Sequence, residues 1–294
     1  MSNGYAIDQC GLYALTSHRK LSDRLGKSVS FIKARARSND LYKEWPEPKK
    51  SGGFRLIEAP RDDLKKLQRR IADLLQRVTP PEFLFSPVKG RSYMDNATAH
   101  VHPKEIRLLD INDYFGQCDA RSVYTFFNTR LRCEPDVAHT LTCLTTRNGH
   151  LPQGSPSSPI LSFYSCWPMW EEVSRLVREV GCSITVYVDD ITISGSFVPE
   201  ELIWRTKEVL RRNGHTHNLR KERRRYQTSA EVTGVIVGQG KFCAPHRHYK
   251  KLQAARIAGR LEPELEARAR EFARARSLES QIQALKRRKT LAGL

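Results

Sequence analysis

The 294-residue chain lacks the features of membrane and secreted proteins. No stretch of 18 or more apolar residues occurs, so no membrane span is expected. The N-terminus lacks the basic-then-apolar pattern of a signal peptide. The seven cysteines are an odd number with no Cys-x-x-Cys pair, which argues against a disulfide framework and against a zinc cluster. His215 and His217 have no cysteine or third histidine nearby in the sequence and are expected on the surface. These absences favour a reducing cytoplasm.

Acidic residues are scarce relative to basic ones. The chain has 50 Lys and Arg against 32 Asp and Glu, a formal net charge of +18. Such an excess makes a polyanion the natural partner and predicts binding that weakens steeply with salt. A basic surface that is merely solvated fits the same numbers. The hydrophobic content of 39% supports a packed core, in one large or two modest domains.

Two acidic residues stand in the middle of an apolar segment. Residues 184–194 consist of two short runs rich in β-branched side chains around Asp189-Asp190, a pattern that predicts a tight hairpin with both carboxylates at its tip. An ordinary turn fits the pair as well, since Asp is common in turns. Because adjacent carboxylates repel each other, the alternative is a divalent cation such as Mg²⁺.

A second acidic strand end strengthens the cation interpretation. Residues 106–110 form a short apolar run that ends at Asp110 and is followed by Asp113, Tyr114 and Phe115. If this strand lies beside the hairpin, Asp110 and Asp189 face one another across the sheet. Carboxylates so placed can hold two Mg²⁺ ions roughly 3.5–4 Å apart, which is the arrangement for nucleotidyl transfer.

The segment between the acids completes a recognisable order. Residues 151–159 read Leu-Pro-Gln-Gly-Ser-Pro-Ser-Ser-Pro, a rigid loop leading into a helix with Ser158 as its N-cap and Pro159 in its first turn. An Asp strand, this loop and Tyr-Val-Asp-Asp, in that order, resemble the palm of a reverse transcriptase. The resemblance implies an α/β (α+β) right-hand fold, with a palm of antiparallel sheet over helices, fingers and a helical thumb.

Two further motifs resemble those of retron reverse transcriptases in particular. Asn-Ala-x-x-His at residues 96–100 and Val-Thr-Gly at 232–234 flank the palm motifs in the expected order. The likeness runs from about residue 49 to residue 238. It implies RNA-directed DNA synthesis on a cognate structured non-coding RNA. The product would be branched, RNA-linked single-stranded DNA (msDNA), in bacterial anti-phage defence alongside a separate effector protein.

The resemblance also implies roles for individual residues. Asp110, Asp189 and Asp190 would be catalytic and would bind two Mg²⁺ ions, with the Ile111 carbonyl as an extra ligand. Phe115 resembles a steric gate that excludes a ribose 2′ hydroxyl, although a core Phe fits its sequence too. The residues expected at the incoming dNTP are Lys50, Arg55, Phe115, Gln153, Gly154 and Lys221. The hairpin around Gly52-Gly53 that carries Lys50 and Arg55 could equally be an exposed basic turn.

Several residues are expected to contact RNA or DNA, namely Lys89, Arg91, Asn96, His100, Tyr187, Thr233, Arg247, Lys250 and Lys251. A buried capping pair is the alternative for Asn96 and His100, which share a helical face. Residues 1–240 are predicted to form fingers and palm. Residues 241–294, with 14 basic and 5 acidic residues, are predicted to form a basic helical thumb, or else a solvated helical tail.

Two other functions remain open at this point. One is another bacterial reverse transcriptase of the intron-encoded or another defence type. The other is a non-catalytic RNA-binding protein on a palm-like sheet, which would tolerate loss of the three acids.

Overall fold

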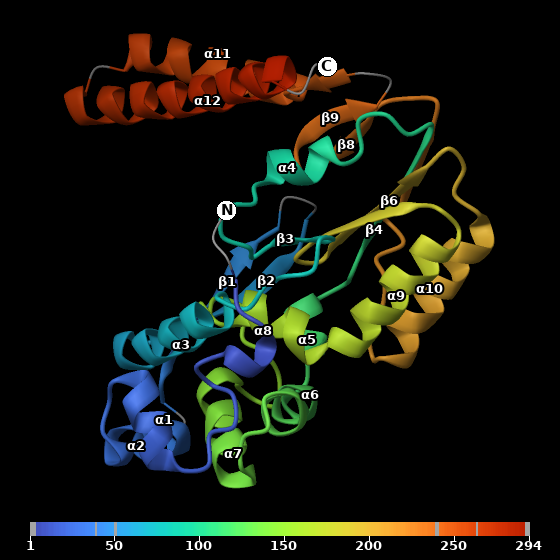
Figure 1. Ribbon diagram of the computed structural model, residues 1–294. Helices are drawn as coiled ribbons and strands as arrows, with labels where there is room; N and C mark the ends of the chain where they lie inside the picture. Colours follow the sequence, from blue (N-terminus) through green and yellow to red (C-terminus); the bar gives the residue numbers. More distant parts are fainter. Residues whose placement is uncertain (1–3, 39, 50–51, 239–240, 263, 292–294) are drawn as a thin grey trace.

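The computed structural model describes residues 4–38, 40–49, 52–238, 241–262 and 264–291 (Figure 1). Its helices are α1 His18–Leu25, α2 Val29–Arg37, α3 Asp62–Leu75, α4 Tyr93–Thr98, α5 Tyr114–Gln117, α6 Ala120–Thr125, α7 Pro135–Thr145, α8 Ser158–Ser165, α9 Trp167–Glu179, α10 Glu200–Arg212, α11 His246–Leu261 and α12 Leu265–Leu291. Its strands are β1 Tyr42–Pro48, β2 Phe54–Pro60, β3 Leu84–Ser86, β4 Glu105–Asp110, β5 Ser183–Tyr187, β6 Asp190–Gly195, β7 Arg223–Tyr226, β8 Ala230–Val232, β9 Val235–Gly238 and β10 Lys241–Cys243. A 3₁₀ turn at Ile7–Gln9 and a π-helical turn at Phe126–Arg130 complete them.

The central sheet has the strand order β3-β5-β6-β4-β7. Its middle strands are runs of β-branched and aliphatic residues, and β6 is buried from Ile191 to Ser194, as expected for strands covered on both faces. All neighbouring strands are antiparallel except β3, which pairs with β5 in parallel. The predicted α/β fold is confirmed, but the sheet is mixed where an antiparallel one was predicted.

Helices α3 and α5 to α10 lie below the central sheet and share one large apolar core (Figure 1). Helix α3 buries Leu64, Leu67 and Ile71 along one face, as its sequence period predicts. The sequence of residues 162–180 predicts one long helix kinked at Pro168, and the structure has two helices there. The chain breaks at Cys166 because Pro168 cannot continue the hydrogen-bond ladder and sits in the first turn of α9.

Strands β1 and β2 form the predicted hairpin, which is largely exposed. Glu47 pairs with Arg55 in its register, and Gly52 and Gly53 both adopt positive φ in the turn, which glycine does without steric cost. Phe54 is 69% exposed at the tip. Lys50 lies outside the described residues.

A small sheet, β10-β9-β8, carries the pair of helices α11 and α12 (Figure 1). Val235, Val237 and Phe242 form a second core together with Ile282 and Leu285 of α12. Strands β9 and β10 pair with each other, so the predicted boundary between 1–240 and 241–294 falls between two paired strands of this sheet. No helix in the described ranges is long and apolar enough to cross a membrane.

The sequence of residues 231–238 predicts one strand in a hairpin with Lys241 and Phe242. The structure has two strands there, joined by a turn at Thr233-Gly234, and the second of them pairs with β10. Both turn residues have positive φ, at 45° and 86°. Val-Thr-Gly-Val-Ile-Val has strand-like composition throughout, which led to the single-strand prediction. The prediction was wrong because the chain turns at Thr233 and Gly234. The left-handed region is uncommon for a β-branched residue such as Thr.

Candidate active site

The three predicted catalytic acids converge at one edge of the central sheet. Asp110 ends β4, Asp190 begins β6, and the two residues are partners in the antiparallel register. Asp189 lies in the turn before β6, and its carbonyl oxygen accepts a hydrogen bond from the N–H of Ile111 at 3.0 Å. The residue directly across the sheet from Asp110 is therefore Asp190, where Asp189 was predicted. All three carboxylates nevertheless belong to one cluster.

The turn that presents Asp189 is strained. Val188 adopts φ 60°, a region that a β-branched side chain enters at a cost of about 1–3 kcal/mol. Its neighbour Tyr187 pairs with Asp190 in the β5–β6 register. The hairpin therefore closes in two residues, and this tight closure places Asp189 and Asp190 beside the end of β4.

Lys221 is the cation that contacts this cluster. Its Nζ lies 2.5 Å from Oδ2 of Asp110. Although partial burial acts to lower it, the pKa of Lys221 is raised by the hydrogen bond to Asp110 and by the charges of the three acids. Lys221 was predicted at the incoming dNTP, and the structure places its ammonium group at the end of β4, beside Asp110.

Asp189 and Asp190 are crowded enough to resist ionisation. Burial and the charge of Asp110 raise the pKa of Asp189. Asp190 is open to solvent on its outer side, yet the protein packed around its carboxyl, followed by the charges of Asp189 and Asp110, raises its pKa to about 7. A single ammonium group does not balance three carboxylates. Hard oxygen donors in such excess are the ligands that divalent cations such as Mg²⁺ prefer, so the residues present fit a metal.

Two cavities meet at the acids. One, of about 1030 Å³, opens toward the β1–β2 hairpin, and the other, of about 620 Å³, opens toward the small sheet. Both are lined by Asp110, Tyr187, Asp190 and Lys221. A reacting group entering from either side would therefore reach the same carboxylates.

The larger cavity contains most of the residues predicted to bind a nucleotide. Arg55, Phe115 and Gln153 line it, and Arg55 is paired with Glu47 across the hairpin. Phe115 is half-buried, with its ring 6.1 Å from that of Tyr114. Gly154 has φ 127°, and a Cβ there would lie 3.1 Å from the carbonyl oxygen of Glu58. A glycine is thus required at position 154 because β2 approaches it closely. The predicted contact of Gly154 with a nucleotide remains a prediction.

The smaller cavity contains part of the predicted nucleic-acid set. Thr233 and Arg247 line it together with Tyr187. The Oγ1 of Thr233 donates to the carbonyl of Tyr93 at 3.0 Å and accepts from Nδ2 of Asn96 at 3.2 Å. The Asn-Ala-x-x-His and Val-Thr-Gly motifs are therefore one physical unit, because the first holds the turn formed by the second.

Two of the predicted nucleic-acid contacts, His100 and Asn96, are corrected by burial, and the buried alternative holds for them. His100 has no exposed surface, and its two ring nitrogens contact Ser194 at 2.6 Å and Thr185 at 2.8 Å. Asn96 is buried as well. The guanidinium of Arg91 is turned inward onto the backbone carbonyls of Pro81, Glu82 and Leu84. His100 and Asn96 therefore hold the protein together internally, whereas Arg91 is half-buried and its contact remains a prediction. Lys89, Lys250 and Lys251 are exposed, and their contacts remain predictions.

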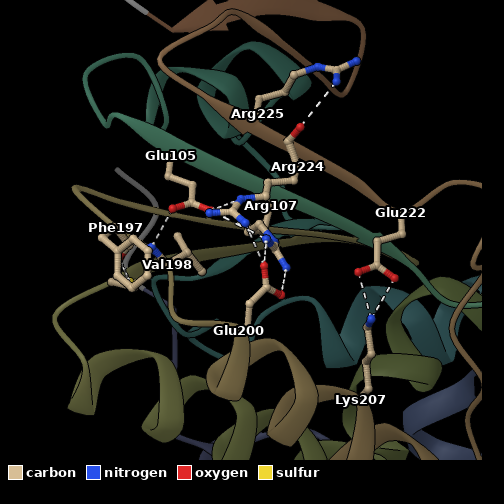
Figure 2. A network of polar contacts seen from close by, with 10 residues as sticks. Glu105, Arg107, Phe197, Val198, Glu200, Lys207, Glu222, Arg224 and Arg225 are labelled. Carbon is tan, nitrogen blue, oxygen red and sulfur yellow. Dashed lines mark hydrogen bonds and ion pairs between the residues drawn. The ribbon is translucent and has the colours of Figure 1, made fainter.

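A buried ion-pair network anchors the far end of the catalytic strand (Figure 2). Glu105 and Arg107 on β4 are almost fully buried. Glu105 accepts from the N–H of Val198 at 3.0 Å and lies 2.8 Å from Nε of Arg224. Arg107 pairs with Glu200 at 2.5 Å, and Arg224 reaches the same carboxylate at 2.9 Å. The network joins β4 to α10 and β7, and so fixes the strand that ends at Asp110.

Sequence reasoning missed this network and one other cluster. The signal available for the ion-pair network was a pair of charged residues at alternate positions of an apolar strand, Glu105 and Arg107. The second consists of Cys118, Cys166 and His215, which come from three distant segments. His215 was predicted on the surface but is 2% exposed. A hydrogen bond with Cys118 and, against the effect of burial, the contact with His215 lower the pKa of the Cys166 thiol.

Comparisons with known proteins agree with this geometry. Residues 47–237 match the family described as reverse transcriptase (RNA-dependent DNA polymerase). Retron Se72 reverse transcriptase from Salmonella heidelberg is 29% identical over 60% of this chain and 45% of that protein. Retron Ec86 reverse transcriptase from Escherichia coli is 26% identical over 86% of this chain and 81% of that protein.

The chain spans about half the length of most of the curated relatives it matches. A solved structure of the foamy viral protease-reverse transcriptase with double-stranded DNA aligns over 72% of this chain and 32% of that one, with 20% identity and a TM-score of 0.44. The family match covers residues from β1 to β9 and includes all three acids. The chain belongs to the reverse transcriptase family, and the curated relatives it resembles are retron reverse transcriptases.

Proposed function

We propose that this protein is the RNA-directed DNA polymerase of a retron, which copies a cognate structured non-coding RNA into branched, RNA-linked msDNA. The observation that carries the proposal is the convergence of Asp110, Asp189 and Asp190 where two cavities meet. One cavity has the position and lining for a dNTP, and the other has those for the primer end. The family match supports the reaction type, and the retron relatives support the kind of template.

Asp110, Asp189, Asp190 and the backbone carbonyl of Ile111 would hold two Mg²⁺ ions. When bound, such ions make a 3′ hydroxyl more acidic and offset the negative charge of the leaving pyrophosphate. The chain itself supplies positioning and electrostatics, with no protein nucleophile. Lys221 holds the Asp110 carboxylate in place and brings a positive charge to the phosphate side of the cavity.

The remaining lining residues orient the nucleotide. Arg55 is placed to exchange its pairing with Glu47 for a triphosphate, because charge-assisted bonds to phosphate are strong and directional. Phe115 is placed to exclude a ribose 2′ hydroxyl. Gln153 extends the floor of the same cavity, and its carbonyl oxygen accepts from the N–H of Glu58 at 2.7 Å. This bond fixes the loop against the β1–β2 hairpin.

The thumb, α11 and α12, supplies a basic face for the RNA. Structured RNA is read through its shape, its 2′ hydroxyls and its phosphates, and exposed lysines such as Lys250 and Lys251 suit the phosphates. In the retron role the protein works in the bacterial cytoplasm with a separate effector in anti-phage defence. Synthesis would start from a 2′ hydroxyl of the RNA.

The proposal is tested by purifying the protein from a native host with its nucleic acid and treating the complex with RNase. We expect a single-stranded DNA that carries a short RNA stub. Asp189→Asn should abolish this DNA and leave the RNA bound. The substitution removes several kcal/mol of charge stabilisation, so the yield of DNA should fall at least about a thousandfold. The exposed Glu201→Gln on α10 is the matched control and should retain the DNA.

Two outcomes would contradict the proposal. RNA without any attached DNA in the wild-type complex would identify an RNA-binding protein. DNA without a branched RNA stub would identify a reverse transcriptase of another type.

A further inference from the structure

Three side chains with metal-binding chemistry meet below the catalytic sheet. Cys118 follows α5, Cys166 lies between α8 and α9, and His215 follows α10. All three are buried. Figure 1 shows these helices gathered under β4 and β6. The three residues take no part in the proposed polymerase chemistry.

The spacing of the ligand atoms suits a tetrahedral ion. The sulfur atoms of Cys118 and Cys166 are 3.8 Å apart, and Nε2 of His215 is 3.2 Å from the Cys166 sulfur. All three atoms lie within 4.8 Å of one another. Two thiolates bound to one zinc ion at about 2.3 Å would have their sulfurs about 3.8 Å apart in tetrahedral geometry. A disulfide would need about 2.05 Å, so the arrangement is that of two separate sulfur ligands.

The imidazole of His215 provides an independent observation. Its Nδ1 is buried and has no hydrogen-bond partner among the described residues. The ring is therefore held at Nε2 by the Cys166 sulfur, whereas its Nδ1 is not held. A cation bound to Nε2 would leave the proton on Nδ1. It would also give the thiolate a permanent counter-charge, without which burial of the thiolate is unfavourable.

We propose that Cys118, Cys166 and His215 form a structural zinc site, with a water molecule as the fourth ligand. Thiolate and imidazole are the ligands that Zn²⁺ prefers, whereas Mg²⁺ prefers oxygen. The site is thus distinct in chemistry from the three carboxylates. Binding requires both thiols to lose their protons, so it releases protons and strengthens with pH.

Such a site would tie the loop after α10 to the catalytic strand. Thr216, next to His215, accepts through its carbonyl from the N–H of Asn112 at 2.8 Å. Its own N–H donates to Oε1 of Gln117 at 2.8 Å, beside Cys118. Further along the loop, the N–H of Asn218 donates to the carbonyl of Asp110 at 2.7 Å. A zinc ion would therefore fix the loop that carries Lys221.

The test uses Co²⁺ as a spectroscopic probe on the full chain, reduced and stripped with a chelator. We expect one equivalent of Co²⁺ to give a thiolate-to-cobalt charge-transfer band, which Zn²⁺ abolishes by displacement. Cys118→Ser, Cys166→Ser and His215→Gln should each lose or strongly weaken the band. The matched controls Cys243→Ser, an exposed thiol, and His217→Gln should keep it.

Asp189→Asn should also keep the band, which separates this site from the catalytic metals. If Co²⁺ binds without a charge-transfer band, or if the band survives Cys166→Ser, the proposal is overturned. Should the variants fail to fold, X-ray absorption of the wild-type zinc form decides. Two sulfurs at about 2.3 Å and a nitrogen at about 2.0–2.1 Å support the site, and a shell of oxygen and nitrogen alone refutes it. A Cys118–Cys166 disulfide in protein alkylated at lysis refutes it as well.

Discussion

The palm and the thumb hold their charged residues in opposite ways. On β4 of the palm, Glu105 and Arg107 are buried and share partners in a network. In the thumb, the ion pair between Arg256 of α11 and Glu279 of α12 spans 2.8 Å, but both side chains are more than 40% exposed. The buried charges fix the position of a strand. The exposed ones leave a basic surface open to solvent.

This contrast separates two requirements of the proposed polymerase activity. The acids at the end of β4 must stay within fractions of an ångström of one place, so Glu105 and Arg107 on that strand are desolvated and are paired with the more exposed Arg224 and Glu200. A nucleic-acid duplex must slide past the thumb, so its charges stay accessible and interact over a distance. Changes in the palm should therefore have large effects that salt does not relieve, and changes in the thumb should have small, salt-dependent ones.

The largest expected effect is on stability, from Glu105→Ala. The substitution removes one of the two carboxylates that Arg107 and Arg224 share, the other being that of Glu200, and removes the acceptor of the Val198 N–H. Breaking a buried pair in this way should cost at least about 3 kcal/mol in the free energy of unfolding, measured by urea denaturation.

The matched change in the thumb is Glu279→Ala. It removes an exposed partner of Arg256, so the expected loss is about 0–1 kcal/mol. Equal losses for the two variants would contradict the distinction between palm and thumb.

The second prediction concerns acid sensitivity. Burial lowers the pKa of His100 to about 4 from a usual value of 6.5. Between these pH values the unfolded chain binds a proton that the folded one does not, so stability falls as pH decreases from 6.5 to about 4. This linkage amounts to about 3 kcal/mol. His100→Gln removes it and keeps an amide for Ser194 and Thr185, so its free energy of unfolding should fall less across that window.

The matched control is His246→Gln, an exposed position at the start of α11 in the thumb. Its free energy of unfolding should follow the wild-type pH dependence. If His100→Gln also follows the wild-type curve, the imidazole does not remain neutral in the folded state.

Features encoded locally could be predicted from the sequence. Strands β4, β5 and β6 carry their own apolar patterns, and Pro168 marks a helix break by its own stereochemistry. The three acids could be predicted because each lies at the end of a strand that has a recognisable apolar pattern. This is why the catalytic cluster was predicted, while the exact partner across the sheet was off by one residue.

Features made by distant segments could not be predicted in this way. No period in the sequence places His215 beside Cys118 and Cys166, and the apparent hydrophilicity of His-Thr-His suggested a surface loop. Likewise, Asn96 and His100 were assigned to nucleic acid, although the fold uses them internally to hold Thr233 and strands β5 and β6. The Asn-Ala-x-x-His motif indicated residues that matter in the fold, but their contacts are with the protein and not with nucleic acid.

The third prediction concerns Mg²⁺ and pH. Burial and the neighbouring acids raise the pKa of Asp190 to about 7. The folded state therefore keeps a proton that the unfolded chain has lost, and stability falls as pH rises from about 4 to about 7. Divalent cations relieve the repulsion between ionised acids. The Tm gained on adding Mg²⁺ should thus be at least about 2 °C larger at pH 8 than at pH 6, a shift of about 1 kcal/mol.

Asp190→Asn should reduce that pH dependence, because one of the repelling groups is gone. The thumb variant Glu279→Ala should leave it unchanged. A Tm gain that is the same at both pH values would show that protons and Mg²⁺ do not compete for these carboxylates.

The smallest expected effect is in the thumb, from Lys250→Ala combined with Lys251→Ala. Both side chains are exposed on α11, so unfolding free energy should stay within about 0.5 kcal/mol of the wild type. If each lysine contacts one phosphate, the slope of log affinity against log salt should fall by about 1.4–1.8 in binding titrations with structured RNA. The control pair Lys65→Ala and Lys66→Ala, also adjacent and exposed but on α3, which lies well below α11 in Figure 1, should leave the slope unchanged. An equal fall in both pairs would mean that the net charge of the chain, and not the position of α11, determines how it binds RNA.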